Sequence, residues 1–357
     1  MKPFKANRYP IEYNVDKEVL RLLSDANIKY GEYKTLLNTL EFEASYFLDS
    51  VLLTESYKST QIEGTQISQD EMYYLKYMEN NDDNLEIQNL KKTIMYAFDR
   101  IQKGGKIDIG LVNEMHRIIL DSVRGSEKSP GQIRTTQNWI GPRGAGIENA
   151  TFIPPAPEEV YMLLQNLYDY MNDEFIDPIL INVALSHVQF ETIHAYRDGN
   201  GRLGRALIPV QMAMLDQSEP MLYMSEILEL YKPSYQRYMM ECRRGNVIGY
   251  IKFFLQCISD QCNNFIIKIR KIKEIYREDM KKIEVLKGSS VYRIMPVLMK
   301  QIVFTKKEVQ ELSGVSVNVV SNLINQLVNI GIIVPDSTIM KKGYRYQRIY
   351  DVFVSNE

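Results

Sequence analysis

One short segment of the chain gathers the residue types needed to bind phosphate and to move a proton. It reads His194-Ala-Tyr-Arg-Asp198-Gly199-Asn200-Gly201-Arg202-Leu203-Gly204-Arg205. Gly199 and Gly201 flank Asn200 where a helix is predicted to begin, and glycines at such a point let backbone amides turn toward an anion at the positive end of the helix dipole. The segment therefore predicts a phosphate-binding loop.

Charged side chains on either side of this loop fit the same chemistry. Arg202 and Arg205 are three residues apart, so they share a helical face and can reach one oligophosphate. The Asp198 carboxylate is an oxygen ligand of the kind that Mg²⁺ takes beside phosphates. A histidine such as His194 titrates near neutrality, which suits removing a proton from a hydroxyl. Each residue alone is more simply a surface arginine, a turn or a satisfied polar group, but together they favour a phosphate site.

Two predicted helices, at 181–193 and 202–214, position the loop, because apolar residues recur there at helical spacing. The same spacing predicts helices around 28–54 and 84–103. Another is predicted at 109–120, with Asp108 as its N-cap. Residues 124–157 are rich in Gly, Pro and Thr and can hold only short strands or a hairpin.

The last part of the chain has a different pattern. A connecting helix is predicted from Phe265 to about Gly288, with an apolar seam among Lys and Arg. Thr305 and Glu308 form a predicted capping box. A short helix, a tight turn, a second helix and two alternating strands follow at 305–312, 314–316, 317–329, 332–334 and 346–350. This order is typical of a winged helix-turn-helix.

The composition is that of an ordinary globular chain. Of 357 residues, 45% are hydrophobic and 25% charged, which is too apolar for a disordered protein. The 43 Lys and Arg nearly balance the 45 Asp and Glu, so net charge does not point to nucleic acid or membrane. Such a partner would have to be bound by a local patch.

Cysteine usage and hydropathy bear on the compartment. Cys242, Cys257 and Cys262 lack the spacing of a zinc site or a CxxC pair, so we expect buried thiols in a reduced environment. No apolar run approaches the ~18 residues needed to span a bilayer, and the first residues lack the apolar core of a signal peptide. We therefore expect a cytoplasmic protein with no membrane partner.

The segment at 194–205 resembles the signature of the Fic-domain family, His-x-Phe-x-(Asp/Glu)-Gly-Asn-Gly-Arg-x-x-Arg. Tyr196 stands where the family has Phe, and Ala195 where Pro is common, and neither replaces a charged side chain. The Tyr196 hydroxyl needs a partner if the ring is buried. Members typically transfer AMP from ATP to a protein hydroxyl, so the resemblance implies an adenylyltransferase.

A second segment looks like the flap of the family, a hairpin that holds the target peptide by strand addition. It reads Arg134-Thr-Thr-Gln-Asn-Trp139-Ile140-Gly141 and is followed by Phe152-Ile-Pro-Pro. Trp139, the one tryptophan of the chain, is equally well interpreted as a core anchor or as a flap contact.

A third segment, Ser59-Thr-Gln-Ile-Glu63-Gly64, matches the inhibitory pattern of the family, (Ser/Thr)-x-x-x-Glu-(Gly/Asn). It also fits a helix C-terminus capped by Gly64, and the two interpretations are compatible. The resemblance places Glu63 against Arg205, which would offset a carboxylate at the negative end of a helix.

The resemblance also implies how ATP and Mg²⁺ are used. Asp198 would hold Mg²⁺ on the α and β phosphates, while Arg202 and Arg205 neutralise the β and γ charge. His194 would take the proton of a Tyr, Thr or Ser hydroxyl as it attacks the α phosphorus. Tyr231 and Tyr235 are candidates for stacking on adenine or, as readily, packing residues. The implied ATP-binding set is Asp198, Gly199, Asn200, Gly201, Arg202, Leu203, Gly204, Arg205, Tyr231 and Tyr235.

The predicted fold is mostly α, with a Fic-type helical core, a small β-hairpin flap and a C-terminal winged helix-turn-helix domain. The expected segments are a helical region with the inhibitory helix, the catalytic core, a connecting helix and the winged domain, at 1–104, 105–260, 261–290 and 291–357.

The sequence leaves more than one partner and more than one function open. The second helix of the winged domain has no Lys or Arg, which disfavours DNA as a partner and favours protein docking or a homodimer. The cationic residues of the wing that could contact a nucleic acid backbone are Lys341, Lys342, Arg345 and Arg348. The leading function is an autoinhibited adenylyltransferase that modifies a protein with an exposed hydroxyl. The alternatives are removal of AMP, transfer of another phosphate-containing group, and a nucleotide-sensing transcription regulator.

Overall fold

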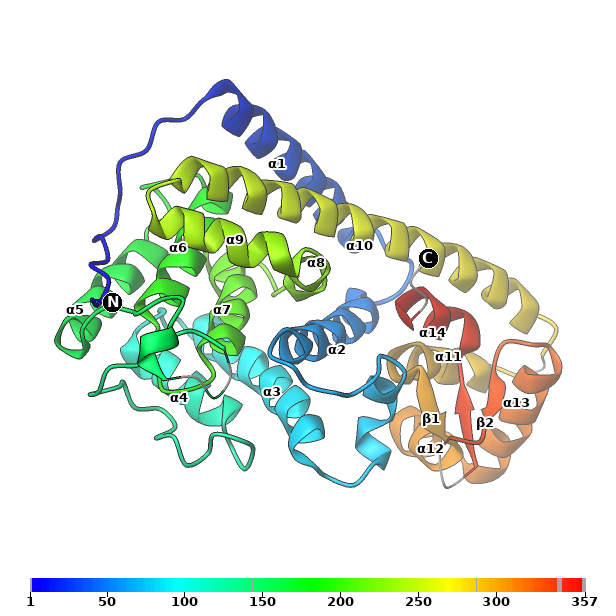
Figure 1. The fold of residues 1–357 in the computed structure, drawn as a ribbon. Coiled ribbons are helices and arrows are strands. Elements are labelled where there is room, and N and C mark those ends of the chain that lie inside the picture. The colour runs from blue at the N-terminus through cyan, green and yellow to red at the C-terminus, as the bar shows by residue number, and fades with distance from the viewer. Residues whose placement is uncertain (1, 143, 145, 287, 339–341, 355–357) are drawn as a thin grey trace. The chain divides into compact units, whose positions relative to one another are not determined.

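A computed structural model describes residues 2–142, 144, 146–286, 288–338 and 342–354 (Figure 1). Helices dominate, as the sequence predicts. The elements divide into two compact units, each drawn from separate stretches of the chain. The first comprises Met1–Tyr30, Glu55–Gln66 and Asn81–Cys262, and the second Gly31–Thr54, Ile67–Asn80 and Asn263–Glu357.

Among the described residues, seven α-helices and the 3₁₀-helix η2 (Ile147–Asn149) lie wholly in the first unit, and three more α-helices contribute to both units. The first seven are α3 (Asp82–Gln102), α4 (Ile109–Ile119), α5 (Pro157–Met171), α6 (Ile179–Ile193), α7 (Asn200–Leu215), α8 (Ser225–Leu230) and α9 (Lys232–Arg243). The shared helices are α1 (Lys17–Asn38), α2 (Ala44–Ile62) and α10 (Val247–Ile283).

Helix α6 is the central helix of the first unit. Every residue from Leu180 to Ile193 is buried, including polar ones such as Asn182 and Glu191, so other elements surround this helix on all sides. It packs between α5 and α7, while α3 packs against α7 and α4. Because α6 is fixed on all sides, its carboxyl end gives the predicted loop at 194–199 a rigid start.

Local signals fixed the beginnings of two helices. Asp108 accepts a hydrogen bond from the Leu111 amide at 2.7 Å and caps α4, as predicted. Thr305 and Glu308 form the predicted capping box. Both devices act within three residues, so neighbouring sequence is enough to identify them.

The second unit contains a helix-turn-helix and a small sheet. Its elements are η1 (Glu71–Tyr77), α11 (Ser290–Gln301), β1 (Val303–Thr305), α12 (Lys306–Ser313), α13 (Val317–Asn329), β2 (Val334–Asp336), β3 (Gly343–Arg345) and α14 (Gln347–Val354). The strands run antiparallel in the order β1-β3-β2, with Phe304 and Pro335 both opposite Tyr344. Gly314, at a positive φ of 62°, makes the turn between α12 and α13.

The predicted strand at 346–350 is wrong. Residues Gln347–Val354 form helix α14, which buries Ile349, Tyr350 and Phe353. These three positions are spaced as one face of a short helix, whereas the strand prediction rested on Tyr346 and Tyr350, whose spacing fits both periods, so a short apolar pattern could not separate the two. The strands are β2 and β3 instead, and β1 was not predicted. Lys341, one of the predicted wing cations, lies outside the described residues.

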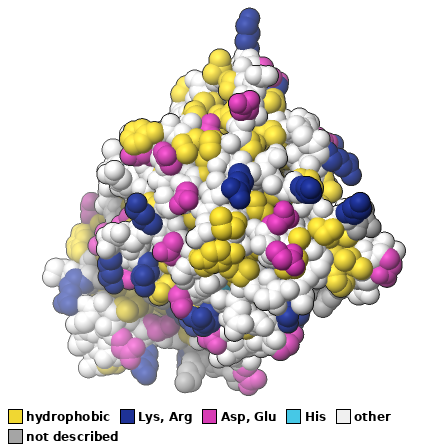
Figure 2. Space-filling model, turned by 90° about the vertical axis from the view of Figure 1, so that its left-hand side faces the viewer, with side chains coloured by type: hydrophobic (Ala, Val, Ile, Leu, Met, Phe, Trp, Pro, Cys, Tyr) yellow, Lys and Arg dark blue, Asp and Glu magenta, His cyan; other side chains and the backbone are white. Residues whose placement is uncertain are grey.

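Two helix boundaries also differ from expectation. The helical pattern around 28–54 is interrupted, since α1 ends at Asn38 and α2 begins at Ala44. The helix predicted to start at Phe265 is instead part of the 37-residue α10, which runs unbroken from Val247. No helix among the described residues has both the length and the apolar character required to cross a membrane. On the face shown in Figure 2, side chains of both charges are interspersed with hydrophobic ones.

Candidate active site

His194 ends α6 in a left-handed conformation, with φ of 48° and ψ of 59°. This turn directs the chain away from the helix axis and into the loop that leads to α7. The side chain lines a cavity of about 620 Å³ together with Asp198, Gly201 and Arg202. The structure therefore brings the predicted base and the predicted phosphate-binding residues to one cavity.

The imidazole of His194 is kept neutral by its surroundings. Burial lowers its pKa to about 4, and the nearby charges of Arg243 and Arg134 act in the same direction. Arg134 is 2% exposed and donates to the His194 carbonyl at 2.9 Å. Arg243 donates to the Glu191 carbonyl at 3.0 Å. These two cations also satisfy carbonyls at the end of α6, where the helix dipole is negative.

Hydrogen bonds of the Asn200 side chain hold the loop after His194, and a glycine lies on each side of Asn200. The Asn200 side chain accepts from the Tyr196 amide at 2.9 Å and donates to the Tyr196 carbonyl at 2.8 Å. Gly199 has a φ of 72° just before α7 begins, a conformation that suits glycine. The first amides of α7 therefore face the cavity side of the loop as an anion-binding helix end.

Tyr196 shows how the departure from the signature is accommodated. Its ring is fully buried and stacks on His116, with centroids 4.0 Å apart. Its hydroxyl donates to Asn113 Oδ1 at 2.7 Å. The additional hydroxyl thus has the partner that burial requires.

Asp198 lies at the mouth of the loop and is held by cations. Lys128 Nζ is 2.7 Å from Asp198 Oδ2, and Arg202 Nη2 is 3.7 Å from Oδ1. Burial alone would raise the pKa of the Asp198 carboxyl, but Lys128 and Arg202 lower it below its usual value. The described residues contain no cluster of three metal-ligating side chains. A single carboxylate beside the predicted phosphate-binding loop is nevertheless compatible with Mg²⁺, which completes its shell with phosphate oxygens and water.

Arg202 carries donors that the protein leaves unused. It is 5% exposed, and among the described residues its Nε and Nη1 have no hydrogen-bond partner. Glu86 Oε1 lies 3.6 Å from Nη1, close enough for charge attraction but not for a good hydrogen bond. Buried N–H groups normally have partners, so the unused donors mark a position where an anion fits.

Arg205 is engaged by the carboxyl end of α2 and by Glu63, the residue that follows it. It donates through Nε to Ser59 Oγ at 2.9 Å and through Nη2 to the Ser59 carbonyl at 2.9 Å. The same Nη2 donates to Glu63 Oε1 at 2.6 Å. The structure therefore brings together the three residues that the resemblance paired, although 142 positions separate Glu63 from Arg205.

The Glu63 carboxylate occupies the anion-binding end of α7. A Cβ atom at Gly201 would collide with Glu63 Oε1, so the carboxylate rests on the glycine backbone. Burial would raise the Glu63 pKa, but the charge and hydrogen bond of Arg205 lower it below its usual value. Gly64, with a φ of 101°, ends the helical segment directly after Glu63.

In the predicted flap segment, the described residues form one β-bridge, between Ile140 and Phe152. The Ile140 amide donates to the Phe152 carbonyl at 2.8 Å. Gly141 lies against Asn149 and Ala150, leaving little room for a side chain. Trp139 is 40% exposed and so is not a core anchor. Phe152 is buried beneath the Arg243 guanidinium, 4.1 Å from its ring centre.

The remaining predicted ATP-binding residues lie away from the cavity. Leu203 is fully buried, and Gly204 packs against Glu191 and Phe190. Tyr235 is 2% exposed, and its hydroxyl is 2.7 Å from His187 Nε2, so it is a packing residue with no free ring face. Tyr231 is 37% exposed and keeps an accessible ring.

Several residues of the site were not predicted. Arg134 and Asn138 belong to the flap segment, yet nothing local indicated that they contact His194. Lys128, Glu86 and Arg243 reach the site from other elements and carry no sequence signal of their own. Only the three-dimensional fold identifies such contacts.

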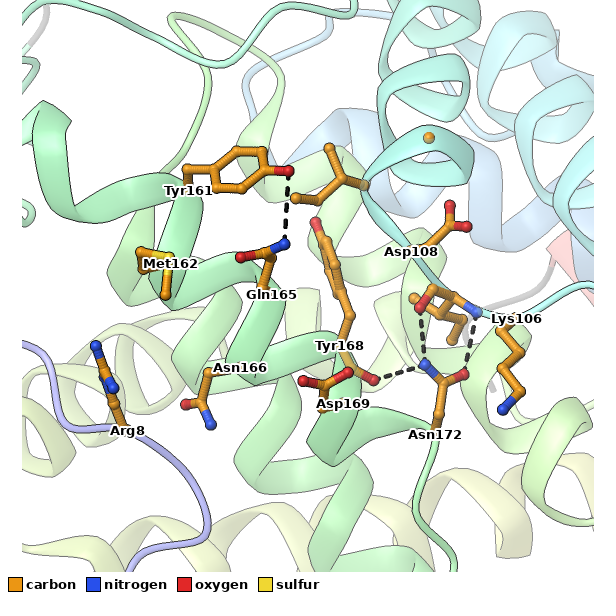
Figure 3. A pocket seen from close by; sticks show the side chains of 13 residues that line it. Arg8, Lys106, Asp108, Tyr161, Met162, Gln165, Asn166, Tyr168, Asp169 and Asn172 are labelled. Atoms are coloured by element: carbon orange, nitrogen blue, oxygen red, sulfur yellow. Dashed lines mark hydrogen bonds between the residues drawn. The ribbon is translucent and has the colours of Figure 1, made fainter.

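A second cavity of about 620 Å³ lies between α5 and the start of α4 (Figure 3). Its polar side chains mostly hold backbone. Asn172 accepts from the Ile107 amide at 3.1 Å and donates to its carbonyl at 2.8 Å. Asn166 pairs in the same way with the backbone of Tyr9, at 2.7 Å. This cavity is an architectural feature, and the chemistry gathers in the cavity at His194.

Two family models match the chain over these elements. The Fic/DOC family model matches residues 106–212, and the Fic/DOC family N-terminal model matches residues 20–99. The chain belongs to the Fic/DOC family. The first match contains the loop and flap, and the second contains α2 with Ser59 and Glu63.

Curated relatives and solved structures agree with this assignment. Protein adenylyltransferase fic-1 of Caenorhabditis elegans is 36% identical over 110 residues, which cover 30% of this chain and 19% of that protein. Protein adenylyltransferase Fic of Nematostella vectensis is 26% identical over 176 residues, or 48% of this chain and 37% of that protein. The aligned part is thus well under half of either relative.

The fold matches at lower identity over longer stretches. A Fic family protein from Desulfovibrio desulfuricans G20 has a TM-score of 0.58 at 15% identity, covering 95% of this chain and 98% of that one. Fic-1 from C. elegans has a TM-score of 0.55 at 19% identity, covering 71% of this chain and 73% of that one. The predicted mostly helical Fic fold is confirmed.

Proposed function

We propose that this chain is a protein adenylyltransferase that is inhibited by its own α2 helix. The observation that carries the proposal is the Glu63 carboxylate on Arg205 at 2.6 Å, resting against Gly201 at the edge of the His194 cavity. An arginine so engaged is not free for a terminal phosphate. The names of the curated relatives support AMP transfer as the reaction.

In this proposal His194 acts on the hydroxyl of the target. One of its ring nitrogens takes the proton while the hydroxyl oxygen forms a bond to the α phosphorus of ATP. The bond from that phosphorus to the α,β-bridging oxygen breaks, and pyrophosphate leaves with its electron pair. A neutral imidazole has one unprotonated ring nitrogen, and it can accept the proton when that nitrogen faces the hydroxyl.

Positively charged and N–H groups hold the phosphates. Arg202 offers its two unused donors, and the amides at the start of α7 point to the same anion. Asp198 would hold Mg²⁺, which would neutralise phosphate charge and orient the α and β groups when bound. Lys128 forms an ion pair with the Asp198 carboxylate, and a metal bound to Asp198 would have to displace Lys128 from one carboxylate oxygen.

The inhibited state would bind ATP in an unproductive position. With Arg205 committed to Ser59 and Glu63, the γ phosphate lacks its cation, and the α phosphorus is not aligned for attack. A misplacement of about 1 Å can cost on the order of 10²-fold in rate. Glu63→Gly should therefore raise AMP incorporation by about that factor, with a modest change in nucleotide affinity.

The test uses ATP labelled at either the α or the γ phosphorus, incubated with cell extract and either wild-type protein or Glu63→Gly. Label transferred from the α position means AMP transfer, and label from γ means phosphorylation. Equal rates for wild type and Glu63→Gly contradict inhibition by α2. The double variant with Arg205→Ala should be slow, because it also loses the γ-phosphate cation.

Removal of AMP from a modified protein is the second candidate. Glu63 lines the same cavity as His194, and its lowered pKa keeps it ionised at neutral pH. A carboxylate there could orient a water molecule toward a bound AMP ester. Release of AMP from a labelled target by wild type, but not by Glu63→Gly, would support this reaction.

The proposed setting is a reduced cytoplasm with ATP and a hydroxyl-bearing protein as partners. Cys242, Cys257 and Cys262 are free thiols, and the last two are buried. We propose that residues 105–260 carry the catalysis and that the helix-turn-helix at 291–357 serves docking or dimerisation.

A further inference from the structure

Asn138, in the segment that leads into the flap, contacts the candidate base directly. Its Nδ2 lies 2.9 Å from His194 Nδ1, 2.9 Å from the Tyr196 carbonyl and 3.1 Å from the His194 carbonyl. Its Oδ1 is buried and has no hydrogen-bond partner within the described part of the chain. The NH₂ group of this amide thus lies near three acceptors, while its oxygen accepts no hydrogen bond from the described residues.

The two carbonyls determine which way the amide faces. Carbonyl oxygens only accept hydrogen bonds, so the NH₂ group must face them and therefore also faces the ring nitrogen. The NH₂ group has two hydrogens for these three acceptors, and a protonated Nδ1 would set N–H against N–H, so the ring nitrogen beside it offers its lone pair. Because a neutral imidazole carries one proton, that proton is then on Nε2 of His194.

This protonation state bears on the chemistry at His194. Asn138 takes up Nδ1, so Nε2 is the nitrogen left to face the cavity that the side chain lines. A protonated Nε2 can donate to an oxygen but cannot accept a proton from a hydroxyl. The arrangement described here is therefore that of an acid, and a base requires the other tautomer.

A turned amide would support the other tautomer without leaving either carbonyl bare. The His194 carbonyl also accepts from Arg134 Nε at 2.9 Å, and the Tyr196 carbonyl also accepts from Asn200 Nδ2 at 2.8 Å. After a half turn, Asn138 Oδ1 would accept a hydrogen bond from Nδ1–H. Oxygen would then face two carbonyl oxygens, a repulsion that makes the observed orientation the resting one.

We propose that Asn138 is a positioning residue whose amide sets which ring nitrogen of His194 carries the proton, and that the amide turns before His194 accepts a proton at Nε2. The exchange is balanced, because one proton leaves Nε2 to water and one is taken up from water at Nδ1. The inference rests on the proposed function for its catalytic consequence, but the tautomer itself can be observed without activity.

The charges that face His194 keep the ring neutral, so the choice of tautomer arises at neutral pH. They are Arg243 and Arg134, which lower its pKa after burial, and Glu63 and Asp198, which oppose them. None of these groups contacts Nδ1, which faces the uncharged Asn138 side chain.

The first experiment is a long-range ¹⁵N–¹H spectrum of full-length protein labelled at histidine. The chain has 3 histidines, and the other two are internal standards. His116 Nδ1 accepts from the Gly131 amide at 2.8 Å, which places its proton on Nε2. His187 Nδ1 faces the Gly204 carbonyl at 3.2 Å, which places its proton on Nδ1. His194 should match His116, and a match to His187 would overturn the proposal.

The second experiment compares Asn138→Asp with Gln137→Glu, both as single changes and in the Glu63→Gly background. Each exchanges an amide for a carboxylate of the same shape in the same segment. Only residue 138 contacts His194, since Gln137 bonds the carbonyls of Asn138 and Pro154. Asn138→Asp should move the proton to Nδ1 and shift the acid limb of the pH–rate profile upward by about one unit or more. Gln137→Glu should leave the tautomer unchanged.

The outcomes separate the two claims. If Glu63→Gly incorporates no AMP, the proposed function fails, while the histidine spectra still test Asn138. If Asn138→Asp leaves the proton on Nε2, the positioning role is wrong even in an active enzyme. Unchanged His116 and His187 signals show that the variant is folded. If Asn138→Asp does not fold, two other spectra test the proposal. Wild type should carry the His194 proton on Nε2, and Asn138→Ala should show a mixture of the two tautomers.

Discussion

Burial, reinforced by two guanidinium groups, keeps the candidate base neutral by lowering its pKa. Arg134 and Arg243 bind backbone carbonyls at the end of α6 and, after burial, are the next causes of the low pKa of His194, about 4. The usual histidine pKa is about 6.5. Lowering it keeps the imidazole neutral through the whole physiological range.

A pH profile follows from this shift. Because the His194 pKa is lowered, the neutral ring persists as pH falls past 6.5, and protonation removes it only near about pH 4. AMP incorporation by Glu63→Gly should therefore stay level from pH 8 to about 5 and fall below that. Initial rates against pH, with nucleotide binding measured alongside, check this. An acid limb centred near 6.5 would contradict it.

His194→Ala tests the role of the ring itself. Transfer in the Glu63→Gly background should fall by about 10²–10⁴-fold, the usual contribution of a general base. ATP binding should persist, because the ring acts on the hydroxyl rather than on the phosphates. Isothermal titration with a non-hydrolysable ATP analogue and a rate assay together separate binding from transfer. Near-normal transfer by folded protein would remove His194 from this role.

Asp198→Asn tests the metal role. It should lower the rate and flatten its dependence on Mg²⁺ concentration, because the amide keeps the shape but loses the charge that a hard cation binds. Glu127→Gln is a matched control, since Glu127 lines the same cavity. The control should keep the wild-type Mg²⁺ titration. A normal titration in Asp198→Asn would mean that the metal is held elsewhere.

At the scale of elements, the carboxyl end of α2 is held by two cations from the other side of the site. Arg205 donates to the Ser59 carbonyl, and Lys232 Nζ donates to the Ile62 carbonyl at 2.6 Å. Cations favour the negative end of a helix by typically 0.3–1 kcal/mol, and by up to ~2 kcal/mol when partly buried. Lys232 therefore helps to keep Glu63 in place.

Lys232→Gln should relieve inhibition partially. We expect AMP incorporation to rise by about 3- to 10-fold, less than for Glu63→Gly, because Arg205 still holds the helix end. Lys58→Gln is the control, since Lys58 lies on α2 but faces Gln61 and Glu229 rather than a backbone carbonyl. Adding Lys232→Gln to Glu63→Gly should change nothing more. A further effect in that double variant would indicate that Lys232 contacts the nucleotide.

At the scale of the whole molecule, the question is whether the helix-turn-helix reads DNA. Helix α13 has no Lys or Arg. Arg345 bonds the Tyr74 hydroxyl at 3.1 Å, and Arg348 is 2.9 Å from the buried Asp279. The two predicted wing arginines are thus engaged within their own unit.

Duplex DNA should therefore bind weakly and without the steep salt dependence of phosphate contacts. Fluorescence anisotropy of labelled duplex at several salt concentrations measures both. Tight binding with a steep slope would favour the transcription-regulator alternative. Lys342→Ala would then show whether the described wing cation contributes.

The sequence was informative where interactions are local. The Asp108 cap and the Thr305 capping box span three residues, and both were predicted. The strand at 346–350 was wrong because so short a segment fits two periodicities, and only the packing of Ile349 and Phe353 decides between them. The loop at 194–205 was found because its chemistry is contiguous in the chain.

Long-range contacts could not be read from the residues themselves. Nothing near Arg134 or Asn138 shows that they contact His194, 60 and 56 positions away. The pairing of Glu63 with Arg205 came from the family pattern and not from physical reasoning on the chain. Tyr235 was a candidate for adenine stacking because the sequence alone does not show that the packing of α9 buries its ring.

Because Gly201 has no side chain, the Glu63 carboxylate can occupy the start of α7, where it excludes a phosphate. Glu63 rests where a Cβ would be, so a phosphate drawn to the same helix end has to displace it. Under the proposed function, productive nucleotide binding and release of the α2 end are then thermodynamically coupled, and the coupling is reciprocal. A substitution that loosens residues 55–64 should therefore favour the productive position of bound ATP, and a triphosphate bound there should in turn speed amide exchange in that segment.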